Sequence, residues 1–584
     1  MSAAQVVALD AVDLQVSGPD TEVLTEDIRG VLRVQDALEA EEDSGRAIVA
    51  AALSDYRRVV ETLYGAGYYS SSVSIRLDGR EAAGIELLAV PATVDRVTVT
   101  VDPGTRFSFG RAVVAPLAPG DTLPDSFAPG QVAAAGAVKD AVQSSVEGWR
   151  AEGNAKAAAV GQSVTADHRA NTLDVAIDID PGPVLTFGNL IITTDSKVRD
   201  RRIRQIAGLP SGARFDPEEL ERVASRLRRA GAFGAVGLTE AETANADGTL
   251  DIELSLSDPK QRRYGFGVEV SSLEGATVSG YWLHRNLLGG AERLRFDFEV
   301  AQIGTADGQG GGTDYSTGVR IERPADLGPD RDLFAFAEFE QLDEPTFQSR
   351  SLELGVGVEQ IFSPERSGSV AVGYLYSETQ DDLGDREFRF LTLPVSYTWD
   401  RRDDVLDATQ GFYLRGEVTP FVGLAGSSSG LRGELDARVY RSLGERVTLA
   451  GRGQIGSVAG AGIDDVPSDF LFFSGGSATV RGQPYQSLTV TNDSGQETGG
   501  RSFLGLSGEA RVAVRDQIDL VGFYDVGYVG GESFYDGSGA WHSGAGLGIR
   551  YDTALGPIRL DAAVPVSGDT GDGLQVYIGI GQSF

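Results

Sequence analysis

The second half of the chain alternates apolar and polar residues over many short segments. The first segment places Tyr264, Phe266, Val268 and Val270 on one face, with glycines and polar residues between them. This period of two predicts a β-strand with one apolar and one polar face. About sixteen such segments begin near residues 262, 275, 291, 313, 331, 346, 367, 386, 411, 431, 445, 503, 517, 540, 555 and 573. We therefore expect residues 260–584 to form an all-β, sixteen-stranded antiparallel transmembrane barrel, with an apolar outer face and a polar lumen.

The first half of the chain contains a repeat. Asp102-Pro103-Gly104 is followed by Phe109-Gly110, and the same pattern returns with the same spacing as Asp180-Pro181-Gly182 and Phe187-Gly188. Self-similarity at a fixed spacing indicates tandem modules, and Asp-Pro-Gly is typical of a turn at which one module ends. Three α+β modules are predicted, at residues 12–104, 105–182 and 183–259. The alternative is three unrelated α+β domains.

Each module is expected to run in the order strand, helix, helix, strand, strand. In the third, a helix over Val198–Ile206 ends near Gly208. Asp216-Pro217 then begins a second helix, because aspartate caps helix N-termini and proline fits the first turn. Asp247-Gly248 predicts the hairpin turn between the last two strands.

A long Gly/Ser-rich segment, residues 458–502, separates the eleventh and twelfth predicted strands. A loop of this length within a compact fold is usually functional. It carries Arg481, whereas Glu509 and Asp525 lie on the polar faces of the two strands that follow. A guanidinium can bind a carboxylate through two parallel hydrogen bonds and keeps its charge. We therefore expect the loop to enter the lumen and bring Arg481 to these acids; the alternative is a turn in a solvated loop.

Three motifs of the chain resemble the outer-membrane assembly superfamily that includes BamA, TamA and the two-partner secretion transporters. They are Val480-Arg481-Gly482, the strand Phe523-x-Asp525-x-Gly527, and the C-terminal Tyr577-Ile578-Gly579-Ile580-Gly581-Gln582-Ser583-Phe584. In that family, periplasmic α+β modules called POTRA domains precede a sixteen-stranded barrel whose sixth outer loop inserts an arginine into the lumen. By this resemblance, Arg481 is that arginine, Asp525 and Phe523 are its strand partners, and Glu509 is a further partner.

The number of modules makes the chain most similar to the TamA branch of the family. BamA-like chains carry about five POTRA domains, and two-partner secretion transporters carry two after a plug helix that is absent here. The resemblance implies a factor that assists insertion or translocation of autotransporters and other outer-membrane proteins, without nucleotide or metal. Its implied partners are unfolded outer-membrane protein clients, outer-membrane lipid and a TamB-like protein that spans the periplasm.

Glycines weaken the two strands that meet to close the barrel. Gly265 and Gly267 lie beside Val268 in the first strand, and Gly579 and Gly581 lie in the last. Glycine adds backbone freedom and offers no side chain to pack. We expect this seam to form fewer ladder hydrogen bonds than any other neighbouring pair. A client strand can then pair with the opened edge, because unpaired backbone groups demand partners in lipid.

Composition and charge limit the partners, metal sites and membrane segments that the chain can have. A formal charge of −34 disfavours nucleic acid and anionic headgroups as partners. The absence of cysteine excludes disulfides and thiolate metal sites, and no apolar run is long enough to predict a membrane helix. The start, Met1-Ser2-Ala3-Ala4-Gln5, lacks the regions of a signal peptide. With the family resemblance, we expect a Gram-negative outer-membrane protein whose POTRA domains lie in the periplasm and whose signal peptide has been removed.

An enzymatic role is not expected. Gly426-Ser427-Ser428-Ser429-Gly430 has the spelling of a nucleophile elbow, but that turn needs a preceding strand and a following helix. His168, His284 and His542 are far apart and lack the spacing of metal ligands. No catalytic residue, metal ligand or cofactor is therefore assigned. The alternative functions are a passive outer-membrane channel, which needs neither tandem modules nor an inward arginine, and a two-partner secretion transporter.

Overall fold

The computed structural model describes residues 9–580, apart from 19–21, 41, 43, 87–89, 273, 305–310, 383, 445, 493–494, 516 and 554–555. The chain forms two compact units. The first comprises Met1–Asn189, Pro210–Leu220 and Glu240–Ile252, and the second comprises Leu190–Leu209, Glu221–Thr239 and Glu253–Phe584. Among the helices that the structure describes, none is long and apolar enough to cross a bilayer.

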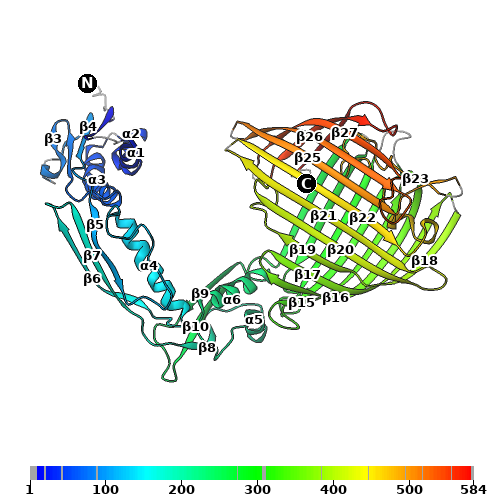
Figure 1. Ribbon diagram of the computed structural model, residues 1–584, viewed down its shortest axis with the longest axis horizontal. Helices are drawn as coiled ribbons and strands as arrows, with labels where there is room; N and C mark the ends of the chain where they lie inside the picture. Colours follow the sequence, from blue (N-terminus) through cyan, green and yellow to red (C-terminus); the bar gives the residue numbers. More distant parts are fainter. Residues whose placement is uncertain are drawn as a thin grey trace, which may run out of the picture. The chain divides into compact units, whose positions relative to one another are not determined.

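Three small sheets, each accompanied by helices, precede the barrel (Figure 1). The first has the order β1-β4-β2-β3 and contains β1 (Ala11–Val16), α1 (Glu22–Val31), α2 (Arg33–Glu39), α3 (Gly45–Gly65), β2 (Ser72–Leu77), β3 (Arg80–Glu81), η1 (Ala82–Gly84) and β4 (Arg96–Asp102). The second has the order β5-β7-β6 and contains β5 (Ser108–Ala115), α4 (Ala135–Ala151), β6 (Ala158–Asp167) and β7 (Thr172–Asp180). The third has the order β8-β10-β9 and contains β8 (Thr186–Ile192), α5 (Asp200–Ala207), α6 (Pro217–Arg229), β9 (Ala235–Glu240) and β10 (Thr249–Ser257).

The expected order of strand, two helices, strand and strand is found in the third sheet only. There α5 ends at Gly208, which adopts the left-handed conformation with φ 60°, and α6 begins at Pro217. The first two sheets correct the prediction, since the first has three α-helices and the second has one among the described residues. In the second, prolines and glycines within residues 116–130 prevent another helix. In the first, buried Asp55 of α3 accepts the backbone amides of Arg33 and Val34 at 2.9 and 3.0 Å and so caps a separate α2.

A closed antiparallel barrel of sixteen strands follows, counted over the described residues. Its strands are β11 (Arg262–Ser271), β12 (Gly275–His284), β13 (Arg293–Ile303), β14 (Asp314–Arg323), β15 (Arg331–Asp343), β16 (Phe347–Ser363), β17 (Arg366–Asp381), β18 (Gly384–Thr392) with β19 (Val395–Asp400), β20 (Gly411–Gly423), β21 (Gly430–Leu443), β22 (Val447–Ala459), β25 (Ser502–Arg515), β26 (Ile518–Gly530), β27 (Ala540–Tyr551), β28 (Ile558–Ser567) and β29 (Gln575–Ile580). Each begins within a few residues of its predicted start, which confirms the fold class.

The eighth strand of the barrel is interrupted. It consists of β18 and β19, which both pair with β17 and with β20. Pro394 lies between them, and proline has no amide hydrogen to donate to a ladder. Its carbonyl still accepts the amide of Ala371 at 3.0 Å, so the wall continues past the interruption.

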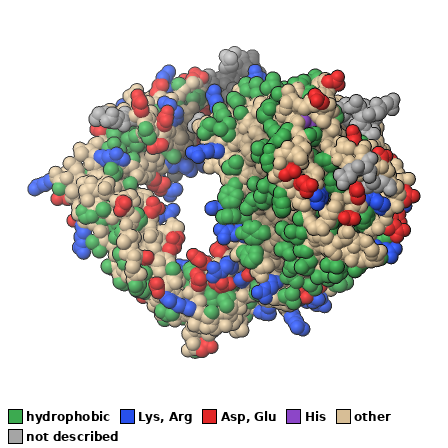
Figure 2. Space-filling model, turned by 45° about the vertical axis from the view of Figure 1, so that its right-hand side comes forward, with side chains coloured by type: hydrophobic (Ala, Val, Ile, Leu, Met, Phe, Trp, Pro, Cys, Tyr) green, Lys and Arg blue, Asp and Glu red, His purple; other side chains and the backbone are tan. Residues whose placement is uncertain are grey.

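The outer wall of the barrel is apolar. Alternate strand residues such as Phe266 and Leu547 are 78% and 74% exposed, as expected for side chains that face lipid. Figure 2 shows hydrophobic side chains gathered over this wall, with charged side chains toward its margins. The opposite faces of the strands carry polar and charged residues into the lumen.

The first and last strands close the barrel through a short pairing. Among the described residues, β11 and β29 share two register pairs, Val270 with Ile578 and Ser271 with Tyr577, fewer than any other strand pairing in the barrel. The partner of Ile578 is thus Val270, not Val268, which is one alternation further along β11. Gly265 and Gly267 lie in β11 beyond these pairs. Gly579 lies in β29, whereas Gly581 and Phe584, like Met1–Gln5, lie outside the described residues.

If the Asp-Pro-Gly turns separate modules, limited proteolysis of the native chain should cut near Gly104 and Gly182 before it cuts α4. Exposed turns are cleaved faster than helices whose backbone hydrogen bonds are made. Mass spectrometry of the first fragments measures the order of cleavage. Cleavage within α4 that is equally fast would contradict the predicted boundaries of the modules.

Candidate functional site

The segment between β22 and β25 folds into the lumen. It contains η2 (Ile463–Asp465), η3 (Ser468–Phe470) and the short strands β23 (Val490–Thr491) and β24 (Glu497–Thr498). Its centre is buried, since Val480, Arg481 and Gln483 are at most 3% exposed. Two glycines make this approach possible. Gly482 has φ +90°, and a Cβ there would lie 2.7 Å from the backbone of Val564 in β28, while a Cβ at Gly527 would lie 2.2 Å from Ser474 Oγ in the loop.

Arg481 is held by carboxylates from three strands. Its Nε and Nη2 donate to the two carboxylate oxygens of Asp525 at 2.8 and 3.0 Å. Its Nη1 donates to Glu509 at 2.7 Å and to Asp561 at 3.4 Å. The guanidinium also lies over the ring of Phe523, with its Cζ 3.6 Å from the ring centroid. The fork geometry of arginine thus links the loop to β25, β26 and β28 at once.

The structure brings most of the predicted site residues together. Val480, Arg481 and Gly482 lie in the loop, and Phe523, Asp525 and Gly527 lie along the facing side of β26. Glu509 is the register partner of Phe523. Tyr577 lies beside the loop, whereas Ile578 and Ile580 face outward at 46% and 58% exposure. Gly265, Gly267 and Val268 are not part of this cluster.

Further ionic residues of the cluster were not assigned from the sequence. Arg511 forms an ion pair with Glu509 at 2.9 Å, and Arg550 forms one with Asp561. The buried cluster therefore balances three arginines against three carboxylates, as a low-dielectric interior requires. Arg550 and Asp561 occupy lumen-facing positions of strands with alternating residues, and this parity was the signal that could have identified them.

The loop also contacts both sides of the closure. On the side of β29, the amide of Gly482 donates to the Tyr577 hydroxyl at 3.1 Å, and the Gln575 side chain donates to the Gly482 carbonyl at 3.0 Å. On the side of β11, Ser477 donates from its amide and its hydroxyl to Glu274 at 2.7 and 2.8 Å. The loop therefore joins the last strand to the turn that follows the first.

A further contact connects the loop to the turn between β15 and β16. Tyr485 donates its hydroxyl to Glu344 at 3.0 Å, and Gln302 donates to Glu344 and to Asp314 at 2.9 and 2.7 Å. Burial, aided by the negative charge of Asp314, raises the pKa of Glu344 to about 7. This contact therefore responds to pH near neutrality.

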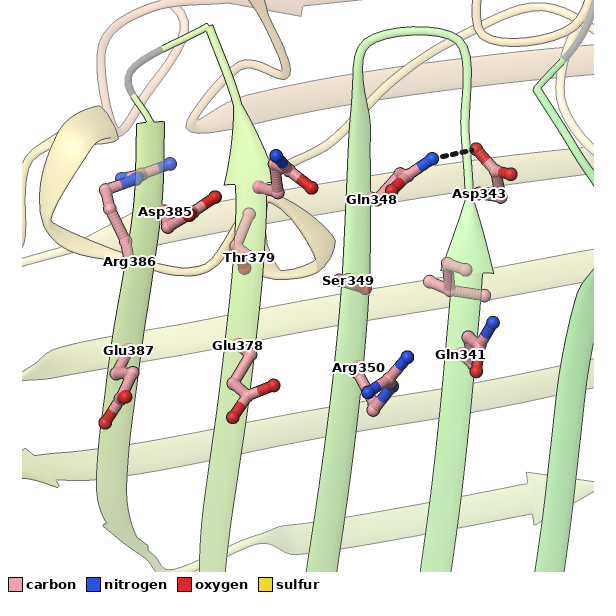
Figure 3. A pocket seen from close by; sticks show the side chains of 12 residues that line it. Gln341, Asp343, Gln348, Ser349, Arg350, Glu378, Thr379, Asp385, Arg386 and Glu387 are labelled. Carbon is pink, nitrogen blue, oxygen red and sulfur yellow. Dashed lines mark hydrogen bonds between the residues drawn. The ribbon is translucent and has the colours of Figure 1, made fainter.

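A polar pocket in the barrel wall is lined in part by Arg386, whose Nη1 also donates to the carbonyl of Asp464 in the loop at 2.7 Å (Figure 3). It encloses about 540 Å³ between β15, β16, β17 and β18. Gln341, Arg350, Glu378 and Glu387 form one row of register partners across these strands, and Gln348 donates to Asp343 at 2.9 Å. They extend the outward face beyond its apolar part, because strands this long exceed the roughly ten residues that span a bilayer. The arrangement supplies no catalytic set.

The described residues offer no group of three or more His, Cys, Asp or Glu side chains that could hold a metal ion. Both ring nitrogens of His542 form hydrogen bonds, one with Ser474 at 2.8 Å and one with Thr570 at 3.0 Å. These bonds connect His542 to the loop. The chemistry of the site is therefore ionic and structural.

Comparison with known proteins matches this architecture. The Omp85 superfamily domain matches residues 255–584. Outer envelope protein 80, chloroplastic, of Arabidopsis thaliana is 25% identical over 359 residues, which cover 55% of this chain and 46% of that protein. The chain thus spans about half the length of this curated relative.

Two solved structures share the fold. BamA from Haemophilus ducreyi lacking POTRA domains 1-3 has a TM-score of 0.61 at 14% identity, and covers 82% of this chain and 100% of its own. CdiB from Acinetobacter baumannii has a TM-score of 0.52 at 12% identity, and covers 82% of this chain and 90% of its own. Both alignments extend beyond the barrel into the preceding sheets.

Replacing Arg481 should release the loop while the barrel stays closed elsewhere. Arg481→Ala leaves Asp525 buried without its cation, while Glu509 keeps its ion pair with Arg511, and the loss is about 3–5 kcal/mol for a broken buried pair. Arg481→Lys keeps the charge but not the fork, so its effect should be smaller. Protease sensitivity of residues 460–501 and thermal unfolding measure the two effects. A loop equally protected in the alanine variant would contradict this role.

The packing of the loop around Glu344 should lose stability as pH rises from about 5 to about 7, because a buried carboxylate then ionises beside Asp314. The folded state binds more protons than the unfolded state between the ordinary pKa of glutamate and about 7, so the free energy of unfolding falls across that window, by at most about 3 kcal/mol. Hydrogen exchange around Tyr485, corrected for intrinsic rates, measures this change. Glu344→Gln should abolish the pH dependence, whereas Glu365→Gln, in the next turn along the chain, should retain it. The same dependence in Glu344→Gln would refute the assignment.

Proposed function

The chain belongs to the Omp85 superfamily, and on that premise we propose that it assists the insertion or translocation of other outer-membrane proteins. It acts in a Gram-negative outer membrane, with its three N-terminal modules as POTRA domains in the periplasm. It is not an enzyme and needs no nucleotide or metal. Its clients, autotransporters among them, pass through the seam between β11 and β29.

The observation that carries this proposal is the loop that bridges the closure. The two register pairs between β11 and β29 are few, and the loop adds contacts to Tyr577 and Gln575 on one side and to Glu274 on the other. A barrel that only conducts solutes requires no such bridge. A barrel that opens laterally requires one, because backbone groups exposed at an open edge must find partners in lipid.

The lumen offers space next to the first strand. A pocket of about 580 Å³ is lined by Gly265, Gly267, Tyr281, Glu299 and other residues of β11 to β14. Because two lumen-facing positions of β11 are glycines, no side chain projects from them into the lumen. An incoming strand that pairs with β11 can therefore place its lumen-facing side chains without displacing large residues.

The N-terminal modules supply a surface for partners. β6 is an edge strand of its sheet, and its residues, including Val160 and Val164 at 67% and 52%, are mostly exposed. An exposed edge with few charges can take up another strand by main-chain hydrogen bonds. We assign this mode to unfolded clients or to a TamB-like partner that spans the periplasm.

A disulfide across the seam tests the proposal. The chain has no cysteine, and Val270 and Ile578 are register partners that face outward. In Val270→Cys/Ile578→Cys, oxidation should stop insertion of an outer-membrane protein client into proteoliposomes, and reduction should restore it. The lock removes the edge that a client strand would pair with.

A control disulfide elsewhere in the barrel distinguishes lateral opening from the alternative functions. Leu506→Cys/Val526→Cys joins register partners of β25 and β26, away from the seam, and should leave insertion unchanged. Full client insertion with the oxidised seam would exclude lateral opening. Solute flux or secretion of a soluble client that persists in the locked protein, without insertion, would instead favour a passive channel or a two-partner secretion transporter.

A further inference from the structure

One ion pair crosses the closure of the barrel. Arg559 lies in β28, where its register partner in β29 is Gly579. Val270 pairs with Ile578 across the seam, so the next residue of β11, Glu269, lies opposite Gly579. Arg559 Nη2 forms an ion pair with Glu269 Oε1. The ion pair therefore joins β28 to β11 across β29, which contributes no side chain to it.

Gly579 opens the path for this pair. A Cβ at that position would lie 3.0 Å from Arg559 Nε and 3.5 Å from its Nη2, so a side chain there would force the guanidinium to shift by a few tenths of an ångström. The Arg559 side chain is only 9% exposed and lies against the backbone of β29. Its Nε has no hydrogen-bond partner among the described residues, so the bond of Nη2 to Glu269 orients the guanidinium.

The ion pair lies next to the last register pair between β11 and β29 that the structure describes. Beyond Val270 and Ser271, the eight residues of β11 toward Arg262 have no register partner within Gln575–Ile580, the described extent of β29. On the other side of the two pairs, the amide of Ser272 donates to Val576 at 2.9 Å, and Val576 donates to Ser272 Oγ at 3.0 Å. Among the described residues, Arg559 and Glu269 thus add a contact between β28 and β11 beside the last register pair of the closure.

Charge around the first strand favours this arrangement. The carboxylate of Glu269 lies close enough to repel those of Glu274 and Glu299. The guanidinium of Arg559 lies close enough to attract the carboxylate of Glu274. Arg559 therefore brings a cation from β28 to an acidic edge of β11 and its neighbours. If β11 and β29 separate, this attraction between the two edges is lost.

We propose that Arg559 and Glu269 form an electrostatic latch that holds the seam shut, and that Gly579 leaves the room that the latch needs to pass over β29. The inference rests on the proposed function, since a latch has a role only if the seam opens. The latch sets the population of the barrel with an open seam in the absence of a client.

Spin labels across the seam test the latch without a client. Val270→Cys and Leu560→Cys place labels on β11 and β28, on either side of Ile578 and facing outward. In this background, Arg559→Gln should raise the population of long distances about two- to fivefold, the range for a partly exposed ion pair. Arg559→Glu and Glu269→Arg, which create repulsion, should raise it further. The double variant Arg559→Glu/Glu269→Arg should restore the distribution of the parent.

Two controls separate the latch from general loosening. Gly579→Ala keeps both charges but shifts Arg559, and should raise the population of long distances by less than Arg559→Gln does. Arg415→Glu disrupts an ion pair with Glu417 within β20, at 3.0 Å, and should leave the distances unchanged. Higher salt should widen the distances of the parent and not those of Arg559→Gln. Heat-modified migration on gels verifies that each variant is a folded barrel.

The result that would overturn the latch is unchanged distances in both single reversals, or no restoration in the double variant. Because the labels report opening and not insertion, this outcome differs from failure of the proposed function. A seam that opens as expected in protein without insertion activity would refute the function and leave the latch standing.

Discussion

A buried guanidinium must be met by carboxylates, and this constraint fixes the interior of the barrel. Arg481 is 3% exposed and reaches Glu509, Asp525 and Asp561 on three strands. Each of these carboxylates is itself buried, so removing its arginine partners would leave an uncompensated charge in the protein interior. Arg511 and Arg550 balance the remaining charge on Glu509 and Asp561. The position of the loop and the relative positions of these strands are therefore set by one ionic cluster.

The sequence predicted the barrel because a strand with one face in lipid has an unmistakable period of two. The same parity placed Glu509 and Asp525 inward, but could not reveal that Asp561 shares Arg481, since contacts between strands depend on register. The interruption at Pro394 and the separate helix α2 of the first sheet were also missed. Proline in a strand and capping by Asp55 act through tertiary neighbours, which a pattern along the chain does not contain.

The lumen supplies contacts that the backbone ladder at the closure lacks. Tyr577 and Gln575 bind Gly482, Glu274 binds Ser477, and Arg559 reaches Glu269. All are side-chain interactions, which can break and form without rearranging the strands beside them. The closure is thus held by groups whose strength depends on charge and solvation, whereas the rest of the wall is held by regular hydrogen bonds.

The proline in the eighth strand has a mechanical consequence. In a cylinder of sixteen strands, the eighth lies half a circumference from the closure. A cylinder that widens along one line must bend along another, and bending is easiest where a rung is missing and the strand can pivot. Pro394 removes one hydrogen-bond donor along that line, so the wall there should resist bending less than it would with an uninterrupted strand.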